Sequence, residues 1–67
     1  MENSLKTERL KHEMTQAQLA ELVKVSRQTI ISIETGRYIP SVLFALKIAK
    51  TLNLYVEDLF QIEDSDY

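Results

Sequence analysis

Three polar side chains within six residues have the chemistry needed to read the edges of DNA bases. Arg27, Gln28 and Ser32 would project from one side of a helix, whereas Ile30 and Ile33 would project from another. An arginine can bridge the two acceptors of guanine, and a glutamine can pair with adenine. An ordinary solvated helix face has the same composition. The spacing alone therefore leaves DNA reading and simple exposure both open.

Two short, capped helices are expected to position these side chains. Thr15 can cap the first helix, and Gln18, three residues later, completes a capping-box pattern. Ser26 can cap the second helix, and Gly36 follows where a left-handed C-terminal cap is needed. Helices joined by so short a turn must cross steeply. The pattern therefore predicts a crossed helix pair at about residues 15–36.

The remaining residues favour three more helices, giving an all-α fold in a single domain over residues 1–67. A first helix is expected within 4–13, although its amphipathic pattern is weak. A broad apolar face predicts a helix over 41–52, and a shorter one is expected over 56–62. Residues 63–67 are interpreted as a frayed acidic tail.

The composition argues against catalysis, metal binding and membrane insertion. The 67 residues include no cysteine and one histidine, so we expect no enzyme activity, no metal site and no cofactor. No small-molecule substrate is evident. The longest apolar run is 42–46, far shorter than the roughly 20 residues that span a bilayer. Without a signal-peptide pattern at residues 1–4, the expected location is cytoplasmic, with no membrane contact.

Charge is distributed unevenly along the chain. The net charge is −2, yet residues 1–50 contain all eight cations and five acids, whereas residues 51–67 contain five acids and no cation. This asymmetry is compatible with a basic face on one side of the domain and an acidic segment on the other.

Several segments together resemble one known family. They are TQAQLA at 15–20, VSRQTI at 25–30, IE-x-GRY at 33–38, PS at 40–41, ALKIA at 45–49 and VEDLF at 56–60. The chain resembles the Xre family, the phage-repressor and Cro-like helix-turn-helix transcriptional regulators. The resemblance implies a compact five-helix, lambda-repressor-like fold, with helices 2 and 3 forming the helix-turn-helix.

The resemblance also implies roles for individual residues. Base contacts are expected from Arg27, Gln28 and Ser32, at the front of the recognition helix. Phosphate contacts are expected from Gln16 and Thr29, and from the backbone of Arg37 and Tyr38. Arg9 and Glu34 match a pair of residues that form a buried, structural ion pair in relatives.

The function that follows is sequence-specific binding to double-stranded DNA. We expect a transcriptional regulator, a repressor acting as a homodimer on a palindromic operator, with a dimer contact at Leu59, Phe60 and Ile62. The alternative is an antitoxin or another interaction module, which would hold a protein partner through helix 5 and the acidic tail.

The sequence departs from the family pattern at four positions. Lys24 occupies a turn position that is usually glycine, so a left-handed backbone there would cost about 1 kcal/mol. Glu8 replaces a core leucine, and Tyr55 replaces the usual cap of the last helix. Ile31 stands where relatives often have a polar residue, and partial burial is expected for it.

Overall fold

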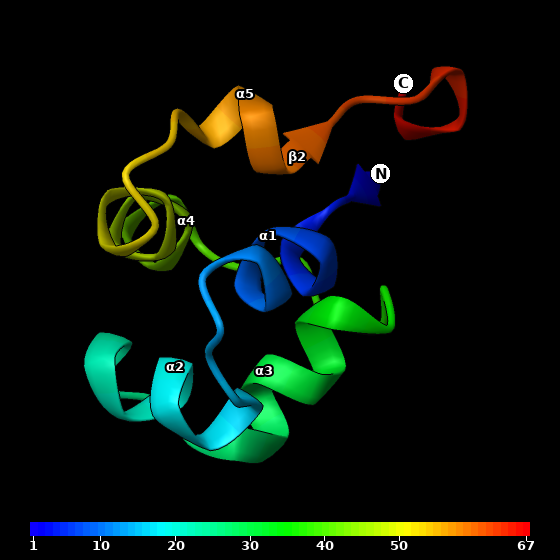
Figure 1. Ribbon diagram of the computed structural model, residues 1–67. Helices are drawn as coiled ribbons and strands as arrows, with labels where there is room; N and C mark the ends of the chain where they lie inside the picture. The colour runs from blue at the N-terminus through cyan, green and yellow to red at the C-terminus, as the bar shows by residue number, and fades with distance from the viewer.

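Five α-helices and a two-stranded sheet make up the computed structural model, which describes residues 1–67 (Figure 1). The helices are α1 (Leu5–Lys11), α2 (Gln16–Val23), α3 (Arg27–Glu34), α4 (Val42–Thr51) and α5 (Val56–Leu59). The strands are β1 (Glu2–Asn3) and β2 (Phe60–Gln61), and a 3₁₀ turn, η1, spans Asp64–Asp66. None of the helices combines the length and apolar composition that a membrane crossing requires.

Side-chain caps begin the three helices that the sequence marks most clearly. The Thr15 hydroxyl accepts a hydrogen bond from the Gln18 amide at 3.0 Å, and the Gln18 side chain accepts one from the Thr15 amide at 2.8 Å. Ser26 caps α3 at 3.1 Å and Ser41 caps α4 at 3.2 Å. Because these bonds satisfy amides that have no partner within the helix, they fix where each helix begins.

Each of the first four helices is followed, within two residues of its end, by a residue with a left-handed backbone. The positive φ angles are 56° at Glu13, 63° at Lys24, 79° at Gly36 and 58° at Asn53. After α2, the Val25 amide donates to the Ala20 carbonyl at 3.0 Å, the bond that defines a Schellman cap. Only one of the four positions is a glycine. The left-handed conformation predicted for Lys24 is therefore present, at the energetic cost of a side chain there.

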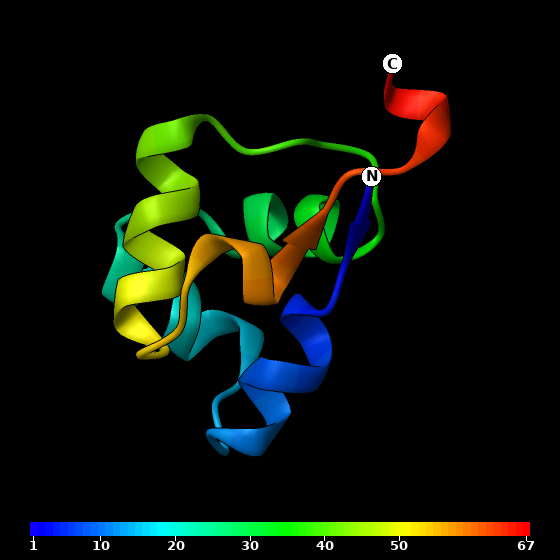
Figure 2. The same ribbon diagram turned by 90° about the horizontal axis from the view of Figure 1, so that it is seen from above.

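A single apolar core lies between the helices. Twelve hydrophobic residues are buried, and they come from every helix and from β2. Figure 1 shows α1 in the middle of the view, with α2 and α3 below it and α5 above. Figure 2 shows α4 along one side, reached from α3 by the long segment that contains Gly36 and Pro40. Arg9 is the one charged residue among the buried residues.

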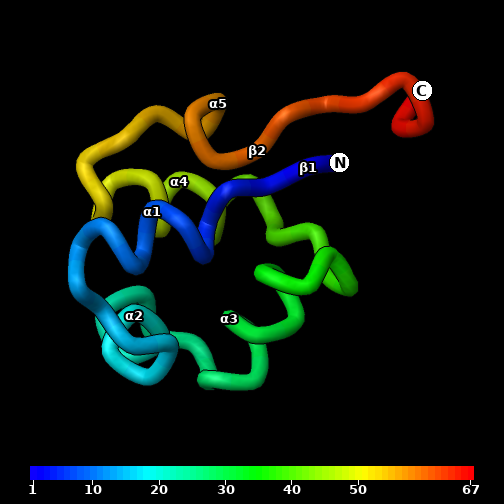
Figure 3. Tube along the Cα trace, turned by 45° about the vertical axis from the view of Figure 1, so that its right-hand side comes forward, coloured from blue at the N-terminus to red at the C-terminus, as the bar shows by residue number.

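The C-terminal segment differs from its prediction. The helix expected over 56–62 ends at Leu59, and Phe60 adopts an extended backbone with φ −127°. Phe60 and Gln61 pair antiparallel with the start of the chain, and they lie opposite Asn3 and Glu2, respectively (Figure 3). The Ser4 amide donates to the Leu59 carbonyl at 2.9 Å. Since these bonds replace those of a further helical turn, α5 contains only four residues.

Candidate nucleic-acid interface

The third helix is anchored from beneath and polar on its outer side. Ile30 and Ile33 are 0% and 1% exposed, so they hold α3 in the core. Arg27 and Gln28 lie in the first turn of α3 and are exposed, whereas Ser32, one turn later, is half-buried. The side chains that could meet base edges therefore occupy one surface of the helix, which runs from its first turn at Arg27 and Gln28 to Ser32 in its second half. Ile31 is half-buried, as expected.

A shallow depression borders this surface. Its lining comes from the turn before α3, from α3 itself, from the following loop and from α4: Val25, Ser26, Gln28, Thr29, Ser32, Tyr38 and Phe44. Within it, the hydroxyls of Ser26 and Thr29 are 2.9 Å apart. Each hydroxyl keeps capacity for a further hydrogen bond. One of the two hydroxyl hydrogens is used in their mutual bond, so the depression can present one hydroxyl donor to an anionic ligand.

Gln16 bridges the ion pair and the exposed arginine. Its Nε2 donates to Glu34 Oε1 at 3.1 Å, and its Oε1 accepts from Arg27 Nη2 at 3.3 Å. The side-chain amide retains one donor hydrogen, and it lies at the N-terminus of α2, where backbone amides favour anions. Sequence reasoning missed this bridge, because its partners are 11 and 18 residues away along the chain.

Arg9 and Glu34 form a nearly buried ion pair. Arg9 Nε lies 2.7 Å from Glu34 Oε2, and the two side chains are 7% and 3% exposed. Arg9 Nη2 donates to the second carboxylate oxygen at 3.3 Å, and Nη1 donates to the Met14 carbonyl at 2.8 Å. The pair therefore joins α1, the turn that follows α1, and the end of α3.

The backbone amides of Arg37 and Tyr38 both form hydrogen bonds within the chain. Both amides donate to the Ser32 carbonyl, at 2.9 and 3.1 Å. Closing the end of α3 uses both donors, so the phosphate contact that the resemblance implied for this backbone would have to replace or share these bonds, and it stays a prediction. The side chains of both residues are exposed, and a contact through them stays a prediction.

The predicted dimer contact also needs a correction. Leu59 and Phe60 are 0% and 8% exposed, so they stabilise the core of one chain and offer almost no surface to a second. Ile62 is 67% exposed. Exposed apolar side chains gather around a groove lined by Ile39, Val42 and Leu46, and the small exposed part of Phe60 borders the same groove.

The acidic tail lies away from the third helix. Figure 1 shows the C-terminus at the upper right, above the N-terminus, with α2 and the start of α3 at the bottom of the view. The Met1 ammonium contacts Glu63 Oε1 and Asp66 Oδ1, each at 3.0 Å. Hydrogen bonds to Glu63 and then Asp66 raise the pKa of this ammonium. Hydrogen bonds from the Glu63 amide and then the ammonium lower the pKa of Asp66. The tail predicted to be frayed thus has defined contacts.

Proteins of similar length are similar in sequence to this chain. A family profile described as "Helix-turn-helix" matches residues 5–59. A protein of Methanocaldococcus jannaschii, described as an uncharacterized HTH-type transcriptional regulator, is 50% identical over 98% of this chain and 100% of its own. YgzD of Bacillus subtilis, with the same description, is 42% identical over the same shares of the two chains.

Two solved regulators share the fold. The restriction-modification controller protein C.AhdI from Aeromonas hydrophila superposes with a TM-score of 0.78 at 28% identity, covering 84% of this chain and 85% of that one. The clp gene regulator ClgR from Corynebacterium glutamicum gives a TM-score of 0.76 at 28% identity, over 81% of this chain and 57% of that one. Proteins of this type bind DNA and are not enzymes. The chain belongs to the helix-turn-helix family of transcriptional regulators, in the Xre group, and α2 and α3 form its helix-turn-helix.

Proposed function

We propose that this regulator reads a specific sequence in double-stranded DNA through α3, and that it acts as a homodimeric repressor on a palindromic operator. One observation carries the proposal. Arg27 and Gln28 are exposed in the first turn of a helix whose opposite side is fixed in the core by Ile30 and Ile33. A helix held in this way can enter the major groove with its N-terminal residues toward the bases.

The polar groups divide into base-reading and phosphate-binding roles. Arg27 suits the two acceptors of guanine and Gln28 suits adenine, while Ser32 can reach an adjacent base edge. The Thr29 hydroxyl and the exposed side chains of Arg37 and Tyr38 would bind phosphates. These phosphate contacts would set the register of the helix on the duplex without specifying sequence.

Gln16 would contribute both a phosphate contact and the orientation of Arg27. Its free amide hydrogen and the N-terminus of α2 can bind one phosphate, while its Oε1 holds the guanidinium of Arg27. Since Gln16 is also bonded to Glu34, the arginine is connected to a fixed group of the core. Preorganisation of this kind lowers the entropic cost of binding.

A second copy of the chain would supply the other half-site. The groove at Ile39, Val42 and Leu46 is a better contact than the residues first predicted, because these side chains are 62%, 76% and 54% exposed. Contiguous apolar surface on a small protein usually marks an interface. The longest dimension of the chain is 33 Å, so two copies fit half-sites that are about 34 Å apart. A dimer over both half-sites would exclude other proteins from that DNA.

Selection from random duplexes at near-physiological salt tests the reading of bases. The protein should enrich an inverted repeat with half-sites about 10–11 bp apart. An Arg27→Ala/Gln28→Ala variant should lose that enrichment. A matched control, Lys6→Ala/Gln61→Ala, removes the same kinds of group from other elements and should enrich the same repeat. Equal enrichment by the protein and the Arg27→Ala/Gln28→Ala variant would rule out base reading by α3.

Sedimentation tests the dimer contact. A Val42→Glu/Leu46→Glu variant places charges in the groove and should sediment as a monomer at concentrations where the unmodified protein is a dimer. Ile62→Glu is the control, since Ile62 does not line the groove. If Ile62→Glu alone made the protein sediment as a monomer, the dimer contact would lie in the C-terminal segment and not in the groove.

The fold does not provide the apolar surface on α5 that the interaction-module alternative would need. Helix α5 has four residues, and Leu59 at its end and Phe60 after it are buried in the core. No contact of α5 or of the tail favours partner capture over DNA binding, and we do not propose it.

A further inference from the structure

Three lysines outside the proposed DNA contacts lie around one groove. Lys24, at the end of α2, and Lys47 and Lys50, in α4, line it together with Leu22, Val23 and Thr51. We call this the lysine groove. None of the three lysines forms an ion pair, since the salt bridges of the structure involve Met1, Arg9 and Lys11.

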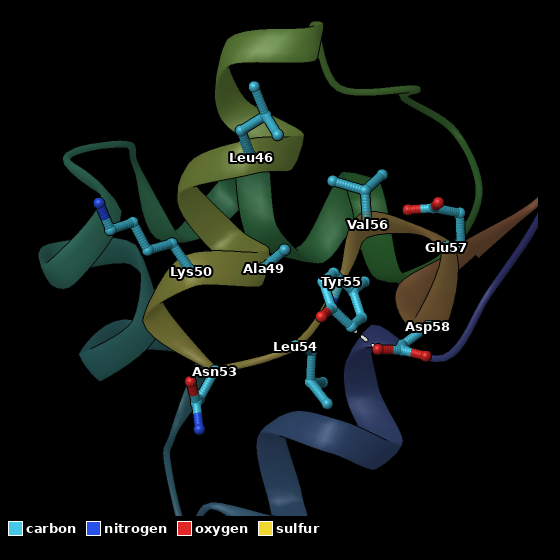
Figure 4. A pocket seen from close by; sticks show the side chains of 9 residues that line it. All are labelled: Leu46, Ala49, Lys50, Asn53, Leu54, Tyr55, Val56, Glu57 and Asp58. Atoms are coloured by element: carbon cyan, nitrogen blue, oxygen red, sulfur yellow. Dashed lines mark hydrogen bonds between the residues drawn. The ribbon is translucent and has the colours of Figure 1, made fainter.

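Nearby carboxylates lie on other sides of these lysines. Lys50 also borders a pocket that contains Glu57 and Asp58, but Figure 4 shows its side chain extending from α4 away from both. Lys24 also borders a surface with Glu13 and Glu21, and no contact within 4.0 Å joins them. Lys47 has no acidic neighbour in its groove. The lysine groove is therefore a positively charged surface without an internal counterion.

Folding alone does not account for this arrangement. Like charges that share a surface repel one another, and Lys24 also adopts a left-handed backbone with φ 63°. Both features cost stability, and no carboxylate of the chain forms an ion pair with these lysines. An external anion bound between the lysines would offset their repulsion.

The lysine groove continues the depression beside the recognition helix. Lys47 Nζ lies 5.6 Å above the centre of the Phe44 ring, and Phe44 lines that depression with Gln28 and Thr29. At the other edge, Lys24 directly precedes Val25, which lines the depression as well. A polyanion lying along α3 would therefore pass from the proposed phosphate contacts onto the lysine groove.

We infer that the lysine groove binds the sugar-phosphate backbone flanking the base pairs that α3 reads, with Lys47 and Lys50 as its principal cations. The inference rests on the proposed function. The contacts add affinity and length to the footprint but no sequence preference, because phosphates carry no sequence information. A lysine suits this role, since its ammonium is a mobile point charge that adapts to flexible flanking DNA.

The experiment compares two double variants that each remove two positive charges. Lys47→Gln/Lys50→Gln alters the lysine groove, whereas Lys6→Gln/Lys11→Gln alters exposed lysines of α1. Dissociation constants for the selected operator are measured over a series of salt concentrations. In the proposed homodimer the variant loses two phosphate contacts per protomer, four in all, so the slope of log affinity against log salt should fall by about 3.6. The α1 variant should change it much less.

Three further measurements complete the test. The hydroxyl-radical footprint of Lys47→Gln/Lys50→Gln should shorten at its flanks, while the selected sequence stays the same. A Lys47→Arg/Lys50→Arg variant keeps both charges and should keep the slope. Thermal melting by circular dichroism should show the glutamine variant folded, because it removes like charges.

Other outcomes would overturn the inference. Equal slopes for the two glutamine variants would show that the lysine groove lies off the DNA. An unchanged slope combined with altered self-association would show that the groove holds the acidic residues 63–66 of a second copy. If the unmodified protein selects no DNA at all, the proposed function fails, which is a separate result from equal slopes.

Discussion

Replacing Arg9 by methionine should destabilise the domain by about 3–5 kcal/mol. The Glu34 carboxylate would lose two hydrogen bonds, at 2.7 and 3.3 Å, while its side chain stays only 3% exposed. One bond would remain, from Gln16 at 3.1 Å, and it cannot neutralise a buried charge. For a domain of this size each kcal/mol lowers the melting temperature by about 4–8 °C, so the expected fall is about 12 °C or more.

Urea unfolding followed by circular dichroism measures this effect, and a second variant tests its cause. Arg9→Met/Glu34→Leu removes both charges and fills similar volume, so it should regain most of the lost stability. Lys6→Met is the matched control on the exposed side of α1 and should change stability by less than about 0.5 kcal/mol. A loss below about 1 kcal/mol for Arg9→Met, or a double variant no more stable than the single, would refute the reasoning.

Three shorter predictions concern other parts of the molecule. Lys24→Gly should raise stability by about 0.5–1 kcal/mol in urea unfolding, because glycine relieves the strain at φ 63° but also adds freedom to the unfolded chain. Gln16→Ala should weaken operator binding about 10-fold or more in a titration, whereas Gln18→Ala, which alters the neighbouring cap, should affect melting more than binding. For a chain with a free amine at Met1, the contact with Asp66 should stabilise the fold above about pH 3.8 and below about pH 8.0, the ordinary pKa values of the two groups. Asp66, with its pKa lowered, loses its contribution as the pH falls through that lowered value, and the ammonium, with its pKa raised, loses its own as the pH rises through the raised value. Within that pH window, a chain with an acetylated amine should melt at a lower temperature than the chain with a free amine. Equal melting temperatures for the two forms would exclude the contact.

Local chemistry explains why most of the helices could be predicted. The capping box at Thr15, the serine caps, and the left-handed residues Lys24 and Gly36 depend only on residues a few positions away. The weak amphipathicity of the first helix is also explained, since Arg9 occupies a buried position and pairs with Glu34 across the core. A polar residue at a core position lowers the apolar periodicity on which such predictions rest.

Contacts distant in sequence account for what could not be predicted. The pairing of β1 with β2 joins residues at opposite ends of the chain, and strands of two residues have no periodicity that a pattern could detect. That pairing ends α5 early and accompanies the burial of Phe60, so the same cause removes both the longer helix and the dimer contact first expected there. The bridge through Gln16 could not be predicted either, because its partners are 11 and 18 residues away along the chain.

Through this bridge, the side-chain amide of Gln16 is linked both to the ion pair that stabilises the domain and to the arginine proposed to read DNA. Glu34 is fixed by Arg9, Gln16 is bonded to Glu34, and Arg27 is bonded to Gln16. Arg9 and Glu34 are nearly buried and have few alternative partners, so they fix the position of Gln16, which in turn orients the exposed side chain of Arg27. It follows that a variant such as Arg9→Met/Glu34→Leu can recover stability and still read DNA less well, since Gln16 then loses the carboxylate that orients it. Measuring operator affinity on that stable double variant separates the two roles: full affinity would mean that Arg27 is positioned by α3 alone.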